Sequence, residues 1–129
     1  AETLVRYFDA TGETPDAFDA VYTGDLGSVG SNLLGSLLEL EGVHLPNHRD
    51  CGLEIYGRTA PGSGASGAGC SAAVLCGHIL PMLARGEMRR VLFLATGALM
   101  SQTTSLQGES IPGVAHLVEF CSEEAMACS

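Results

Sequence analysis

The sequence predicts a single α/β domain, because short apolar segments of strand length alternate with longer segments of helical periodicity. Two features support this class. Residues Val91–Thr96 form an unbroken apolar run, as expected of a central strand covered on both faces. The glycine-rich segment Gly62–Ser71 leads directly into an apolar helical pattern, and its glycines allow the sharp turn of a loop before a helix. With 129 residues, 46% of them hydrophobic, we expect one domain over residues 1–129.

The first elements are short. Thr14 and Pro15 predict a helical turn that ends near Phe18, with threonine as its cap and proline at its first position. A strand is expected over Ala20–Thr23, and the glycine-bounded loop Gly24–Gly27 ends it.

The middle of the chain predicts one helix and one strand. The helix is expected over Asn32–Glu41, because Ser31 can cap it and leucines recur at helical spacing up to Gly42. The polar segment His44–Asp50 favours irregular structure, and Cys51–Tyr56 is expected to form a second short strand.

The last elements are a long helix and two strands. The helix should run over Ala68–Ala84 and end at Gly86, with a buried face made of residues 72, 75, 79 and 83. The strand Val91–Thr96 follows, and after a loop a final strand is expected over Val114–Phe120.

The glycine-rich segment is the strongest functional signal. Its glycines allow sharp turns, and the first turn of the following helix leaves backbone N–H groups without intrahelical partners. Together with the positive end of the helix dipole, these N–H groups favour a carboxylate or phosphate. The sequence therefore predicts an anion-binding site where Gly62–Ser71 enters the helix.

Composition excludes several classes of function. Fifteen acidic residues face six arginines, and the net charge of −9 argues against a nucleic-acid partner. No apolar run is long enough for a membrane span, and the first residues lack the pattern of a signal peptide. We therefore expect neither a transmembrane segment nor a signal peptide. The five cysteines have no paired spacing and are expected to be small buried thiols. Neither a metal site nor a cofactor is expected, since the four histidines show no ligand spacing.

Four motifs follow one another along the chain in a recognisable order: YTGDLGSVG, DCGLEIY, GSGASGAGCSAAV and VLFLATGALMSQTTSLQGESIPGVAHLVEF. From Phe18 to Phe120 they resemble the C-terminal part of the stage V sporulation protein AD family, a thiolase-like family of endospore-forming bacteria. The resemblance implies one half of the duplicated αβαβα thiolase fold. It would be a mixed sheet of five or fewer strands with helices on both faces.

The resemblance also implies a ligand. The family is implicated in taking dipicolinic acid, a pyridine dicarboxylate, into the developing spore, beside membrane proteins that form a channel. Paired N–H donors suit the two carboxylates of this dianion. The expected ligand-binding residues are Ser63, Gly64, Ser66 and Gly67 in the glycine-rich segment, with Asp25 and His116.

Catalysis is the main alternative. In ketoacyl synthases, which are condensing enzymes of the thiolase superfamily, a histidine and an asparagine of this half stabilise the oxyanion. In this chain Gly24 and Asp25 stand near the position of the histidine, and Ser63 stands near that of the asparagine. A carboxylate would repel an oxyanion, so no catalytic residue is expected. An acyltransferase or ketosynthase completed by a missing N-terminal half stays open, with Ser63, Cys70 or His116 in modified roles. A purely structural dimer scaffold also stays open, and Asp25 could simply bond its own loop.

The expected partners follow from the resemblance and from the apolar surface that half of a fold would expose. They are the protein's own N-terminal half or a second copy, giving a homodimer, and the channel proteins of the spore inner membrane. The expected location is peripheral to that membrane or on its cytoplasmic face.

Overall fold

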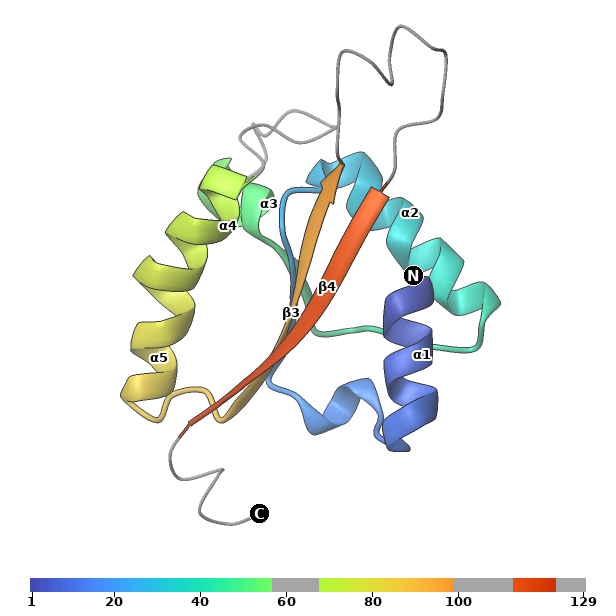
Figure 1. Cartoon of the computed structure of the whole chain (residues 1–129), viewed down its shortest axis with the longest axis horizontal. Coiled ribbons are helices and arrows are strands. Elements are labelled where there is room, and N and C mark those ends of the chain that lie inside the picture. Colours follow the sequence, from blue (N-terminus) through green and yellow to red (C-terminus); the bar gives the residue numbers. More distant parts are fainter. Residues whose placement is uncertain (57–67, 99–112, 123–129) are drawn as a thin grey trace, which may run out of the picture.

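The computed structural model describes residues 1–56, 68–98 and 113–122, and it shows an α/β domain built on an open mixed sheet (Figure 1). Four strands form the sheet in the order β2-β1-β3-β4 within the described residues. They are β1 (Ala20–Thr23), β2 (His48–Asp50), β3 (Arg90–Ala98) and β4 (Gly113–Cys121). Strand β1 is parallel to both β2 and β3, whereas β4 pairs with β3 in the antiparallel sense. The α/β class and, for the described residues, a mixed sheet of five or fewer strands are therefore confirmed.

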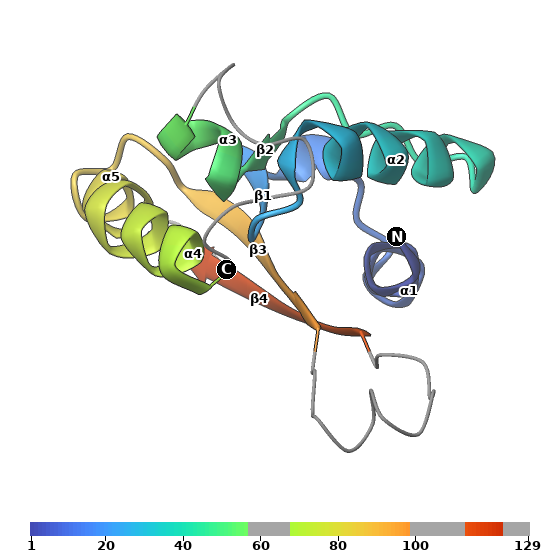
Figure 2. The ribbon, with the colours of Figure 1, turned by 90° about the horizontal axis from the view of Figure 1, so that it is seen from above.

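Helices cover both faces of this sheet, as Figure 2 shows from above. Helices α1 (Glu2–Thr11) and α2 (Gly27–Leu40) lie against one face, and α4 (Ala68–Val74) and α5 (Leu80–Ala84) against the other. Two core clusters result. The first joins Leu4, Phe8, Leu34 and Leu38 to the sheet, and the second joins Val74, Ile79 and Leu83 to it.

The expected central strand is confirmed in β3. Val91 and Phe93 belong to the cluster under α4 and α5, while Leu92 and Leu94 belong to the cluster under α1 and α2. All four side chains are buried, because successive side chains of a strand point to opposite faces and both faces are covered. Each contributes about 1.5 to 3 kcal/mol to stability by its burial.

The long helix predicted over residues 68–84 is present, but it is not regular. A π-helical turn over Leu75–Ile79 separates α4 from α5, just before Pro81. Proline has no N–H group to donate to the preceding turn, so a local change of helical winding is expected there. Gly86 ends the helix with a φ of 76°, as predicted. Ala72 is exposed, so its place on the predicted buried face was wrong.

Three predictions for residues 31–56 were wrong. Helix α2 begins at Gly27 rather than after Ser31, because the cap of its first turn comes from a distant side chain, Asp50. The segment Cys51–Tyr56 forms helix α3 instead of a strand. The end of the segment expected to be irregular, His48–Asp50, forms strand β2 instead. The helix α1 was not predicted.

A polar cluster near the start of β3 and the end of β4 ties α1 to these two long strands. The guanidinium of Arg90 donates hydrogen bonds to Glu13 and Glu119 at 2.9 Å and lies 4.5 Å from the ring centre of Phe18. Burial, followed by the nearby Glu119 and Glu13 carboxylates, raises the pKa of Tyr7 to about 12. This cluster anchors β4 far from the edge discussed below.

Candidate functional site

The sheet has a topological switch point between β1 and β3. The connection from β1 to β2 runs through α2 on one face, and the connection from β2 to β3 runs through α4 and α5 on the other. The chain therefore leaves β1 in one direction and returns on its other side. In open α/β sheets, ligands bind outside the carboxyl ends of the strands at such a point. The starts of α2, α3 and α4 gather at this edge, where α3 contacts both neighbouring helices.

Asp50 organises this edge from the end of β2. Its side chain is buried, with 2% of the residue exposed, and its carboxylate accepts four hydrogen bonds. The backbone N–H groups of Leu26 and Gly27 donate at 2.9 and 3.1 Å, and that of Leu53 donates at 3.4 Å. One carboxylate thus holds the first turns of both α2 and α3, where helix dipoles favour negative charge.

The fourth donor to Asp50 is the hydroxyl of Thr23, at 2.6 Å. The same hydroxyl oxygen lies 2.9 Å from Nε2 of His48. A hydroxyl has one proton and an ionised carboxylate can only accept, so the proton of Thr23 points to Asp50 and Nε2 of His48 must donate to Thr23. Burial lowers the pKa of His48 despite the nearby Asp50 charge, so the ring is neutral at neutral pH with its proton on Nε2.

Asp25, the predicted site residue of the first loop, lies beside Asp50. A Cβ added to Gly52 would overlap the Asp25 carboxylate and lie 3.2 Å from Oδ2 of Asp50. Glycine at position 52 therefore allows the Asp25 side chain to pack against the start of α3. The structure brings Asp25 to the switch point, and it places a second carboxylate next to it.

The other predicted site residues separate into two groups. Ser63, Gly64, Ser66 and Gly67 lie outside the described residues, but the helix that follows them begins at the same edge as Asp25. His116 lies on β4, paired with Ala95 of β3, and its side chain is exposed. It shares a face with Phe120, toward α4 and α5. No described contact joins His116 to Asp25.

Sequence reasoning missed Asp50, Thr23 and His48. All three are polar residues at strand ends, and β2 is only three residues long, so no hydrophobic pattern marked it. The available signal was an aspartate directly before a helical segment, which is the usual composition of a helix cap. That signal is hidden when Cys51–Tyr56 is interpreted as a strand, because a strand needs no cap.

The described residues limit other kinds of site. Across residues 1–56, 68–98 and 113–122, no three side chains of the His, Cys, Asp and Glu types are arranged to hold a metal ion. No helix among them combines the length and apolar character needed to cross a membrane. Cys51 is buried as expected, but Cys76 is exposed and Cys121 is only partly buried, so the prediction of buried thiols was wrong for Cys76 and holds only in part for Cys121.

Comparison with known proteins gives the family. Residues 1–121 match the family described as Stage V sporulation protein AD. The chain is also 41% identical over 122 residues to Stage V sporulation protein AD of Bacillus subtilis (strain 168). That alignment covers 93% of this chain but 36% of the relative, so the chain spans about a third of the relative's length. With nearly its whole length matched in both comparisons, the chain belongs to the stage V sporulation protein AD family.

Proposed function

We propose that this chain is a non-catalytic, thiolase-like part of a sporulation protein that binds dipicolinic acid for its uptake into the developing spore. The dianion would lie at the switch point of the sheet. Backbone N–H groups of the segment from Ser63 to Gly67 and of the first turn of α4 would bind its carboxylates. This segment follows α3, whose start is held by Asp50.

The observation that carries this proposal is the difference between two helix starts at one edge. The N–H groups at the start of α2 are already bonded to the buried carboxylate of Asp50. An added anion there would meet two acidic side chains, Asp50 and Asp25, and would be repelled. The start of α4 follows the glycine-rich segment at the same edge, so it is the favoured place for an anion.

Asp25 has a defined role in this proposal. Its carboxyl group is packed against Gly52, near the start of α2, and the proposal puts the ligand on the side of α4. It would hold a carboxylate of the ligand away from α2 and toward α4. His116, exposed on the α4 side of β4, would supply a further polar wall.

The proposed partners rest on exposed surface. The outer face of α4 and α5 carries many small exposed residues, among them Ala73, Gly77 and Ala84, together with the exposed His78 and with Leu80, which is 40% exposed. Small residues allow another helix to approach closely. We infer that the remainder of a longer polypeptide, or a second copy, packs here and completes a thiolase-like fold. Channel proteins and a position at the spore inner membrane complete the proposal.

Calorimetric titration of dipicolinate tests the function. It should be carried out on this chain and on a longer polypeptide that contains the remainder of the family sequence. Saturable binding by either protein supports the proposal. If the 129-residue chain binds dipicolinate without the remainder of the family sequence, the donors lie within this chain. Absence of binding by both, or covalent labelling of the longer protein by a radiolabelled acyl-CoA, would contradict it.

A further inference from the structure

Helix α2 exposes a second apolar face. Its residues Leu34 and Leu38 are buried against the sheet, as expected of an amphipathic helix. Four other aliphatic residues of α2 are exposed: Val29 by 64%, Leu33 by 58%, Leu37 by 43% and Leu40 by 83%. Since an α-helix turns about 100° per residue, these four lie within an arc of roughly 80°. We call them the α2 stripe. An apolar row of this kind is typical of a surface that packs against further protein.

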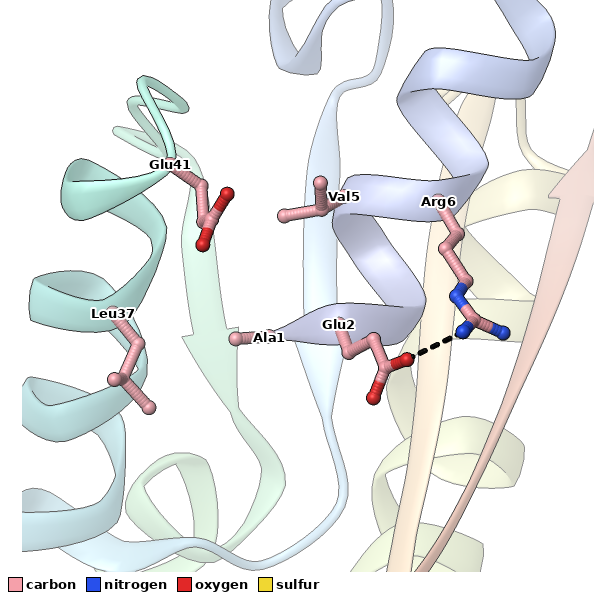
Figure 3. A pocket seen from close by; sticks show the side chains of 6 residues that line it. All are labelled: Ala1, Glu2, Val5, Arg6, Leu37 and Glu41. Atoms are coloured by element: carbon pink, nitrogen blue, oxygen red, sulfur yellow. Dashed lines mark ion pairs between the residues drawn. The ribbon is translucent and has the colours of Figure 1, made fainter.

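The α2 stripe meets the start of α1 at a pocket (Figure 3). The pocket has a volume of about 400 Å³, and Leu37 of the stripe forms its apolar wall together with Ala1 and Val5. Ala1 and Val5 are four residues apart, so they lie on the same side of α1. The side of α1 that faces α2 is therefore apolar at its first turn.

The charges at this pocket do not select an occupant of either sign. Arg6 is paired with Glu2 at 2.6 Å, and Glu41 shares the lining with the amino group of Ala1. Burial lowers the pKa of that amino group, and in a longer polypeptide the group would be an uncharged peptide N–H. The apolar wall is therefore the feature that an occupant has to match.

The first turn of α1 has no side-chain cap. Its N-cap residue is Ala1, whose methyl group cannot accept a hydrogen bond from the first N–H groups of the helix. The carbonyl groups of a preceding helical turn would accept these hydrogen bonds. In Figure 3, α1 runs from Ala1 toward the level of Glu41, so an added turn would run the opposite way, past Leu37. Leu33 lies one turn earlier in α2 and would be reached next.

A family member of the length of the matched Bacillus subtilis protein has polypeptide for such turns. The alignment covers 36% of that protein, so about two-thirds of its residues lie outside the matched part. A segment joined to Ala1 is held at the pocket by the chain itself. It reaches the α2 stripe without the loss of translational freedom that accompanies binding of a separate protein or a second copy.

We propose that in a longer polypeptide of this family α1 continues for about two turns before Ala1, and that these turns cover Leu37 and Leu33 of the α2 stripe. The residue four positions before Ala1 would be apolar and would face Leu33, because it continues the row of Ala1 and Val5. This surface lies on the α1 and α2 side of the sheet, so the proposal does not depend on a ligand at the switch point.

Proline at position 1 tests this proposal. In the 129-residue chain Ala1 is the N-cap of α1, where proline is tolerated, so A1P should leave the helix content unchanged. In a longer family polypeptide, position 1 would lie inside the helix, where proline removes a backbone donor and clashes with the preceding turn. The readout is the rate at which a maleimide labels L33C, measured by mass spectrometry of the peptide that contains residue 33.

The expected difference lies in the longer polypeptide. L33C should be labelled at least about tenfold more slowly there than in the 129-residue chain, and A1P should restore most of the rate. D16C, at an exposed position outside the α2 stripe, controls for access of the reagent. Equal labelling of L33C in both proteins, or protection that A1P does not relieve, would overturn the proposal. So would protection that is lost on dilution, because it would assign the stripe to a second copy.

A disulfide test does not depend on the proline variant. In the longer polypeptide, a cysteine placed four positions before Ala1 should form an intramolecular disulfide with L33C. It should form none with L80C, because Leu80 lies on α5, on the opposite face of the sheet (Figure 2). Failure of the first pair to form, or its formation only between two molecules, would contradict the proposal.

Discussion

The starts of α2 and α4 lie at the same edge of the sheet but follow segments of different composition. At α2, the protein provides its own anion, because the buried carboxylate of Asp50 accepts hydrogen bonds from Leu26 and Gly27. At α4, the preceding segment is rich in glycine and serine, a composition suited to backbone donors that face a ligand. The comparison teaches that helix starts at one switch point need not be equivalent, because a buried carboxylate of the protein already occupies the start of α2.

The largest expected effect comes from removing the internal anion. D50A leaves the N–H groups of Leu26, Gly27 and Leu53 and the hydroxyl of Thr23 without their acceptor at a buried position. We expect a loss of about 3 to 5 kcal/mol in the free energy of unfolding, measured with urea. The exposed Asp16 gives the control, since D16A should change stability by about 0.5 kcal/mol or less. A similar loss in both variants would remove the special role of Asp50.

The glycine-rich segment should show the opposite behaviour, with binding rather than folding affected. G64V and G67V should each raise the Kd for dipicolinate by at least about tenfold, because a branched side chain blocks backbone donors from the ligand. Calorimetry measures the Kd, and thermal unfolding checks the fold. Unchanged affinity in both variants would support the alternative of a purely structural scaffold.

Two glycine-to-alanine variants sharpen the description of the α2 side. G52A would place a Cβ against the Asp25 carboxylate, and we expect a loss of about 1 to 3 kcal/mol. Gly35 lies inside α2 with open space around it, so G35A should gain about 0.5 to 1 kcal/mol from helix propensity. The free energies of unfolding of G52A and G35A, measured with urea, test both expectations. A stable G52A would mean that Asp25 is not held against α3.

The smallest effect concerns pH. Because the pKa of folded His48 lies below its ordinary value of 6.5, the unfolded chain binds more protons, and stability increases with pH through this window. The contribution is fully present above about pH 6.5 and is lost as the pH falls through the folded pKa. H48Q keeps a donor to Thr23 but cannot titrate. Between about pH 7.5 and pH 5, the parent chain should lose more stability than H48Q. Equal slopes would contradict the assignment.

Much of the fold could be predicted from local pattern. Ala20–Thr23 and Val91–Thr96 were found because an apolar run is a direct consequence of burial on both faces. The early start of α2 and the strand at His48–Asp50 could not be found in this way. Their stability comes from hydrogen bonds between residues more than twenty positions apart, such as Asp50 to Gly27. A polar strand of three residues leaves no periodicity to read.

The candidate site was predictable to a similar extent. Asp25 was predicted from the resemblance, because it stands near the position of the superfamily histidine after the first strand, and the structure places it at the switch point. Ligand binding by Ser63, Gly64, Ser66 and Gly67 remains a prediction. Asp50 was missed because a capping role across the sheet depends on tertiary contacts, and a sequence shows only neighbours along the chain.

The most direct test of the difference between the two helix starts is a titration of dipicolinate followed by amide resonances of the ¹⁵N-labelled chain. Saturable shifts at Gly64, Gly67 and the first residues of α4, with Leu26 and Gly27 unmoved, are the result we predict. Shifts centred on Leu26 and Gly27, or saturable binding that leaves the glycine-rich segment unchanged, would contradict the account.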